Sequence, residues 1–153
     1  MEVGVRRTSL DTVPCPVARS LDVIGDWWSL LIVRDALLGR TRFGEFQKSL
    51  GLSRNILTQR LRALVVDGIL DQVPASDGSA YQEYVLTPKG RDLFQVLVAL
   101  RQWGIKHCFD GETCDSVLVD RAEGLPVKPL ELHAADGRLL DAADTMLLDQ
   151  TAA

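Results

Sequence analysis

Apolar residues in the first part of the chain recur at the three- and four-residue spacing of an α-helix. Val17, Leu21 and Ile24 form one such stripe directly after a proline, which is favoured in the first turn of a helix. The spacing continues through two further segments, each bounded by a capping residue or a glycine. The pattern therefore predicts three successive helices, over residues 16–24, 27–38 and 43–50.

A fourth predicted helix follows after a very short connection. Gly51 permits the chain to reverse, Leu52 is an apolar anchor, and Ser53 is a good N-cap for the next helix. That helix, over 54–67, carries its apolar side chains on one face, at Leu57, Leu61, Leu64 and Val65. Two helices joined by so tight a turn have the spacing of a helix-turn-helix.

After the fourth helix the period of the apolar positions changes from 3.6 residues to two. Residues 69–73 and 81–87 alternate as strands around an Asp-Gly turn, which predicts a β-hairpin. Thr87 and Pro88 then predict the start of one long helix that ends near Cys108. Its apolar stripe comprises Leu93, Val96, Leu97, Leu100 and Trp103. In a chain of this size, a second subunit is the expected partner for that stripe.

The chain thus divides into three predicted parts. Residues 1–14 form an N-terminal arm, and 15–108 form a domain for DNA binding and dimerisation. Residues 109–153 are an acidic extension whose short alternating runs predict strands; the alternative is a partly disordered tail, against which its leucines and valines argue. The predicted fold class is mainly α with a small β-hairpin wing, a winged helix-turn-helix, plus a small C-terminal β appendage.

Charge is distributed unevenly, although the net charge is only −4. Residues 39–62 contain six basic side chains and one acidic side chain, whereas 110–153 contain ten acidic and three basic ones. The total argues against a protein that binds nucleic acid through its overall charge, but the basic segment permits a focused contact.

One face of the fourth predicted helix carries side chains that suit the edges of DNA bases. In the major groove arginine bonds guanine, asparagine and glutamine bond adenine, and threonine contacts the thymine methyl group. The residues on this face are Arg54, Asn55, Thr58, Gln59 and Arg62. Phosphate contacts are expected from Arg40, Arg42, Lys48 and Ser53. The alternative is an ordinary solvated helix face, but the order of the elements and the local charge favour DNA.

These segments, in order, resemble the HxlR-type winged helix-turn-helix transcriptional regulators. The resemblance rests on Cys-Pro at 15–16, LDVIG at 21–25, the tryptophan of the second helix, RFGEF at 42–46, LTQRLRAL at 57–64 with the following DGIL, and YVLTPKG at 84–90. It covers roughly 15–108 and implies a bacterial repressor or activator that dimerises through its first and last helices. The chain departs from the family pattern in its longer tail and in its wing, which contains no arginine or lysine.

Cysteines and tryptophans suggest control by an effector. Cys15 matches the N-terminal cysteine that some HxlR-type regulators use as a redox or electrophile sensor, and a helix N-terminus favours a thiolate. The alternative is a structural thiol. Trp27, Trp28 and Trp103 are candidates for the lining of a pocket for a small aromatic effector, although packing is the more usual role of such tryptophans.

Other chemistry is not indicated by the sequence. His107, Cys108, Cys114 and His133 lack the spacing of a zinc site, so no metal or cofactor is predicted. No glycine-rich phosphate loop, GxSxG or HExxH motif suggests an enzyme. No apolar run predicts a membrane span, and the N-terminus is not a secretory signal. Three sparse cysteines favour the cytoplasm.

We therefore predict a cytoplasmic, sequence-specific regulator that binds a pseudo-palindromic operator in double-stranded DNA as a homodimer. A thiol oxidant or a small aromatic effector is the expected control. The alternative is a winged-helix module for protein interaction that has lost DNA binding, which the acidic tail and the wing without basic residues favour.

Overall fold

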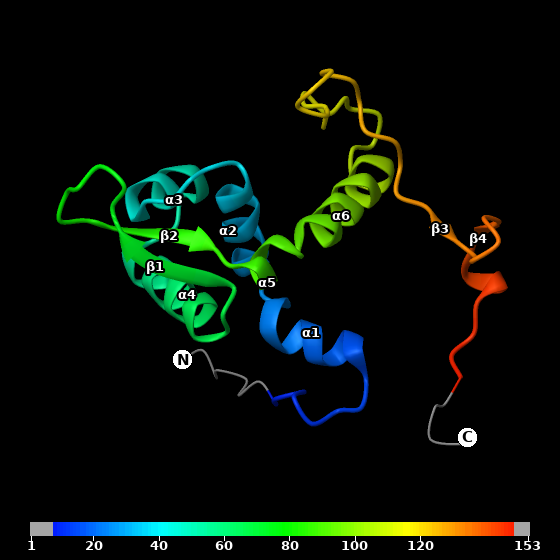
Figure 1. The fold of residues 1–153 in the computed structure, drawn as a ribbon, viewed down its shortest axis with the longest axis horizontal. Coiled ribbons are helices and arrows are strands. Elements are labelled where there is room, and N and C mark those ends of the chain that lie inside the picture. The colour runs from blue at the N-terminus through cyan, green and yellow to red at the C-terminus, as the bar shows by residue number, and fades with distance from the viewer. Residues whose placement is uncertain (1–7, 149–153) are drawn as a thin grey trace. The chain divides into compact units, whose positions relative to one another are not determined.

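The computed structural model describes residues 8–148, and the chain forms two compact units that divide between Leu97 and Val98 (Figure 1). The described elements of the first unit are α1 Pro16–Ile24, α2 Trp27–Leu37, α3 Phe43–Leu50, α4 Arg54–Val66, β1 Leu70–Pro74, β2 Gln82–Leu86 and α5 Pro88–Arg91. Helix α6 contains the division. The remaining elements are α6 Phe94–His107, β3 Leu132–His133, β4 Leu139–Leu140 and the 3₁₀ turn η1 Ala142–Asp144.

The predicted capping residues hold the helix N-termini of the first unit. The Asp26 carboxylate accepts a hydrogen bond from the Ser29 backbone N–H at 3.0 Å, which fixes the start of α2. The Ser53 hydroxyl likewise accepts from the Ile56 N–H at 3.3 Å at the start of α4. Gly51, between α3 and α4, has a φ of +65°, a left-handed conformation in which a side chain is strained. The helix-turn-helix spacing is therefore confirmed.

The core of the first unit lies where α2, α3 and α4 meet the β-hairpin. Its buried members are Ile32, Val33, Phe46, Leu52, Leu57, Leu61, Leu64, Ile69 and Leu70. The predicted apolar face of α4 supplies three of these residues, so the opposite face of the same helix is turned away from the core.

The hairpin is the predicted wing. Strands β1 and β2 pair antiparallel, in a register that runs from Leu70 opposite Leu86 to Pro74 opposite Gln82. The segment before α3 adds to the same sheet, because the Tyr84 N–H donates to the Thr41 carbonyl at 2.7 Å. The wing and the entry to the helix-turn-helix are thus joined by backbone hydrogen bonds.

The predicted long helix over 88–108 is wrong in one respect, since it is interrupted at residues 92–93. The Leu93 N–H donates to the Gly90 carbonyl, three residues back, which tightens the last turn of α5 and ends it. Side chains of α5 also attach it to the end of α4 and to β2: Lys89 Nζ donates to the Asp67 carbonyl at 2.6 Å, and an Arg91 guanidinium nitrogen donates to the Leu86 carbonyl at 2.6 Å. Helix α5 therefore belongs to the base of the wing, and α6 is a separate helix that begins at Phe94.

The second unit contains the predicted small β appendage. Strands β3 and β4 pair antiparallel, and an isolated bridge joins Val119 to Pro126. Val98 is the single buried apolar residue among the described residues of this unit. Half of the predicted N-terminal arm, residues 1–7, lies outside the described part of the chain.

Candidate nucleic-acid interface

The outer face of α4 presents the five side chains predicted to contact bases. Because Leu57, Leu61 and Leu64 are buried, the helix is held with its opposite side toward solvent. On that side Thr58 is half-buried. The other four side chains are exposed: Arg54, Asn55, Gln59 and Arg62. The structure therefore brings the predicted residues together on one accessible helix face.

Three of these side chains have their polar groups free. Within the described residues, Asn55, Gln59 and Arg62 make no side-chain hydrogen bond or ion pair, so their donors and acceptors are available to a ligand. Arg54 is different, because its guanidinium carbon lies 5.2 Å from the centre of the Phe43 ring, a cation–π contact between α4 and α3. The Thr58 hydroxyl donates to the Arg54 carbonyl at 2.8 Å, so it can only accept a hydrogen bond from another partner.

The four predicted phosphate-contacting residues fall into two groups. Lys48, in the last turn of α3, is exposed and has no ionic partner among the described residues, and Ser53 is exposed at the N-cap of α4. The two arginines, in contrast, are paired within the chain. Arg40 lies 3.5 Å from the buried carboxylate of Asp35, and Arg42 contacts two carboxylates of the wing.

The contacts of Arg42 form a small ionic cluster at the wing. Its Nη2 bonds the Asp77 carboxylate at the hairpin turn, and its Nε lies 3.4 Å from the nearly buried Glu83 carboxylate of β2. The Ser76 hydroxyl donates to the same Glu83 oxygen at 3.1 Å. Hydrogen bonds from Arg42 and then from Ser79 hold the pKa of the Asp77 carboxyl well below its ordinary value. The wing is therefore fastened to the N-cap of α3 and carries acidic charge at its turn.

A further ion pair links α4 to the start of α2. Arg60 of α4 reaches the Asp26 carboxylate at the start of α2, with the two atoms 3.3 Å apart. Three of the six basic residues in 39–62 are thus engaged with carboxylates of the chain, and the segment is less cationic than its composition indicates. The sequence analysis missed the acidic partners of all three arginines. No periodicity links Arg42 to Asp77 or Arg60 to Asp26 across the chain, and the nearby Asp35 was not considered as a partner of Arg40.

The cysteine and the tryptophans that were predicted to respond to an effector do not form a single site. Cys15 is exposed at the N-cap position of α1 and makes no capping hydrogen bond through its side chain. Trp27 is 72% exposed and meets Trp28 edge to face, with ring centres 6.2 Å apart. Trp103, on α6, lies 5.3 Å from the ring of His107. The two pairs of rings belong to different units of the chain.

The described residues offer no group of three or more histidine, cysteine, aspartate or glutamate side chains that could hold a metal ion. Over residues 8–148, none of the helices combines the length and the apolar character that crossing a bilayer requires.

Comparison with known proteins identifies the family. The HxlR-like helix-turn-helix model matches residues 23–112. The uncharacterized HTH-type transcriptional regulator Rv3095 of Mycobacterium tuberculosis is 41% identical over 128 residues, which cover 81% of this chain and 73% of that protein. The crystal structure of PA1607, a candidate transcription factor, is 57% identical, with a TM-score of 0.87 over 92% of this chain and 99% of the other.

A more distant structure is that of the redox regulator HypR in its oxidized form. It is 34% identical, with a TM-score of 0.54, and the match covers 59% of this chain and 94% of HypR. The family is one of transcriptional regulators and not of enzymes. On the matched residues and the fold together, the chain belongs to the HxlR-like helix-turn-helix transcriptional regulators.

Proposed function

We propose that this regulator binds a specific sequence in double-stranded DNA by placing α4 in the major groove. The observation that carries the proposal is the row of exposed, unpaired Asn55, Gln59 and Arg62 side chains on the second helix of a helix-turn-helix. Amide and guanidinium groups bond adenine and guanine edges in a groove that admits one helix. Arg54, at the start of α4 and stacked on Phe43, is presented in a fixed position for the same purpose.

Phosphate contacts in this proposal come mainly from Lys48, Ser53 and the N-terminal end of α4. Lys48 has no ionic partner among the described residues, so it enters a complex without breaking a pair. Arg40 and Arg42 are paired with carboxylates in the free protein. Each would contribute to DNA affinity only after its carboxylate partner is replaced by a phosphate of the DNA. The wing turn, with Asp77 at its tip, would be repelled by a phosphate backbone rather than drawn to it.

The active species in this proposal is a homodimer, formed through α1 and α6. Each of these helices exposes apolar side chains: Val17 is 67% exposed on α1, and Trp103 is 61% exposed on α6. Three further residues of α6 are also exposed: Phe94, Val96 and Leu100. Apolar area of this kind marks an interface. A twofold dimer would place two α4 helices roughly 34 Å apart and would favour a pseudo-palindromic operator in the bacterial cytoplasm.

The experiment is selection of bound sequences from random DNA, followed by measurement of binding to the selected site and to unrelated DNA. Gln59→Ala should cost about 1–3 kcal/mol on the selected site only, because it removes a base contact. Lys48→Ala is the matched control, since it should weaken all sequences alike and lower the slope of log affinity against log salt by roughly one per subunit. Equal losses for Gln59→Ala on both DNAs would refute base contact by α4.

The alternative function is a winged-helix module that binds another protein. The acidic wing turn and the internal pairing of Arg40, Arg42 and Arg60 favour it. The same selection separates the two functions, because an interaction module would enrich no sequence and would show no dependence of specificity on Gln59.

Control by a thiol oxidant at Cys15 is a refinement of the proposed function. Cys15 is exposed at a helix N-terminus, and a structural relative of this chain is a redox regulator. Treatment with diamide should therefore release the operator from the native protein and leave Cys15→Ser bound. An operator complex that is equally sensitive in both proteins excludes Cys15. A small aromatic effector at Trp27, Trp28 or Trp103 would instead quench tryptophan fluorescence without modifying a thiol.

A further inference from the structure

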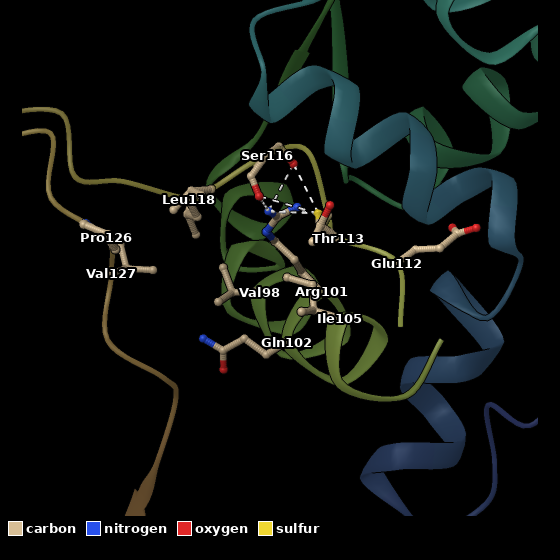
Figure 2. A pocket seen from close by; sticks show the side chains of 12 residues that line it. Val98, Arg101, Gln102, Ile105, Glu112, Thr113, Ser116, Leu118, Pro126 and Val127 are labelled. Atoms are coloured by element: carbon tan, nitrogen blue, oxygen red, sulfur yellow. Dashed lines mark hydrogen bonds between the residues drawn. The ribbon is translucent and has the colours of Figure 1, made fainter. Parts of the chain in front are cut away.

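The second unit contains an open cavity of about 450 Å³ beside α6 (Figure 2). Its walls are mostly apolar, with contributions from Val98, Ile105, Val117, Leu118, Pro126 and Val127. A volume of this size is typical of sites for small molecules, which combine apolar walls with a few polar groups that fix orientation. All the lining residues belong to the second unit, outside the helix-turn-helix.

Part of the polar lining of the cavity gathers around one guanidinium, whereas Gln102 and Glu112 line the cavity elsewhere. Figure 2 shows the Arg101 side chain reaching from α6 to Ser116, whose carbonyl accepts a hydrogen bond from Nη2 and whose hydroxyl lies 3.1 Å from it. The same nitrogen lies 3.7 Å from the sulfur of Cys114. A nucleophile and a fixed cation therefore share one wall of a small-molecule cavity.

The protonation of Cys114 responds to these neighbours. As a thiol it donates to the Ser116 carbonyl at 3.5 Å, and its sulfur lies 3.6 Å from the Ser116 hydroxyl. Hydrogen bonding by the Ser116 backbone and hydroxyl, supported by the charge of Arg101, lowers the pKa of the Cys114 thiol from its ordinary value. Because the thiolate is the reactive form, this environment favours attack by the sulfur.

We propose that Cys114 is a covalent site for small, apolar α,β-unsaturated carbonyl compounds, which enter the cavity beside Arg101. The Cys114 thiolate attacks the β-carbon, so a sulfur–carbon bond forms while the carbon–carbon π bond breaks. The electron pair moves to the carbonyl oxygen as an enolate, which the Arg101 guanidinium stabilises, and the α-carbon then takes a proton from water. The step needs no oxidant, and the apolar walls hold the carbon skeleton.

Accessibility alone predicts a different order of reaction among the three cysteines. Cys15 and Cys108 are exposed, whereas Cys114 is half-buried. If exposure governed the rates, Cys114 would react most slowly. The proposal predicts the reverse, because the cavity admits the reagent and the neighbours favour the thiolate.

The experiment is limited labelling of the full chain with N-ethylmaleimide at neutral pH, with each cysteine-containing peptide followed by mass spectrometry. Cys114 should be labelled several-fold faster than Cys15 and Cys108. Iodoacetamide, which alkylates without forming an enolate, serves as the second reagent. The ratio of maleimide rate to iodoacetamide rate should be higher at Cys114 than at Cys108.

Arg101→Met tests the guanidinium, with circular dichroism and the rate at Cys108 as checks on the fold. The maleimide rate at Cys114 should fall toward that of Cys108, and the ratio of the two reagents should become equal at both sites. Arg101→Lys, which keeps the charge, should retain part of the rate. Slower labelling of Cys114 than of Cys15 and Cys108 in the native chain would overturn the proposal, as would a ratio unaffected by Arg101→Met. No DNA is present, so these results stand apart from the proposed function.

Discussion

Substitution of Gly90 by alanine would place a methyl group against the backbone of the wing. A Cβ at this position would lie 2.2 Å from the carbonyl oxygen of Ile69 and 2.9 Å from a methyl carbon of Leu86. The oxygen cannot retreat by itself, because it also accepts a hydrogen bond from the Thr87 N–H at 3.1 Å. Relief to an ordinary contact distance would require α5 to move by about 1 Å from the base of the hairpin.

The expected loss of stability follows from these contacts. Overpacking a well-fitted site costs about 1–3 kcal/mol. Movement of α5 would also weaken its N-terminal cap, in which the Gly90 N–H donates to the Thr87 hydroxyl at 3.0 Å, at a cost of about 1 kcal/mol. We therefore expect Gly90→Ala to lower the free energy of unfolding by about 2–4 kcal/mol, a large part of the roughly 5–15 kcal/mol by which a domain is stable.

The same substitution elsewhere provides a matched control. Gly44 lies in α3, and a Cβ there would meet nothing within 4 Å. Gly44→Ala should be neutral or should stabilise the protein by about 0.5–1 kcal/mol, because alanine loses less conformational entropy in a helix. Urea unfolding at one protomer concentration, followed by far-ultraviolet circular dichroism, compares the two variants with the native chain. Similar midpoints for both variants would refute the close packing of α5 on Ile69.

Two further predictions concern the charged groups near the wing. Asp77→Asn should strengthen binding to all DNA sequences and steepen its salt dependence by about 0.9 for each phosphate that Arg42 gains, as measured by fluorescence anisotropy over a range of KCl; an unchanged slope would show that Arg42 stays on Glu83. The Glu45 carboxylate accepts the Arg42 and Thr41 N–H groups at 2.9 and 2.8 Å, which lowers its pKa, so its contribution to stability is present above the ordinary glutamate pKa and is lost as the pH falls through the lowered one. Glu45→Gln should therefore destabilise the protein at about pH 7 and have a much smaller effect at about pH 3 in urea unfolding; equal losses at both values would contradict this linkage.

Much of the first unit could be predicted from the sequence, because its signals are local. The apolar spacing of α4 places Leu57, Leu61 and Leu64 in the core, and the period-two run after it gives the wing. Capping is equally local, since an aspartate or serine hydrogen-bonds a backbone group three residues away. The interruption at residues 92–93 could not be predicted, because it depends on how α5 is held to the distant Asp67 carbonyl as well as to the nearby Leu86 carbonyl.

The YVLTPKG segment was identified only as a motif, and the structure gives the physical reason for two of its residues. In the sequence, the segment resembles the corresponding segment of the HxlR-type regulators. In the structure Thr87 caps α5 and its hydroxyl also donates to the Gly68 carbonyl at 2.6 Å, so one side chain joins the end of α4 to the start of α5. Gly90 is required because the Ile69 carbonyl occupies the space of a Cβ. Both residues thus hold α5 against the end of α4 and the base of the wing.

The charge of the helix-turn-helix segment illustrates the opposite case, in which composition misleads. Counting residues gives six cations against Glu45, but the chain itself occupies Arg40, Arg42 and Arg60 with carboxylates. A paired arginine contributes to DNA affinity only the difference between its phosphate and carboxylate contacts, so pairing reduces what Arg40, Arg42 and Arg60 would add. In the proposed function, the attraction to DNA would then rest on Lys48, Arg54 and Arg62. In the proposed complex, nonspecific attraction from so few free cations would be weak, so the preference for an operator would come from the proposed base contacts of α4 and from the pairing of two such helices in the proposed dimer.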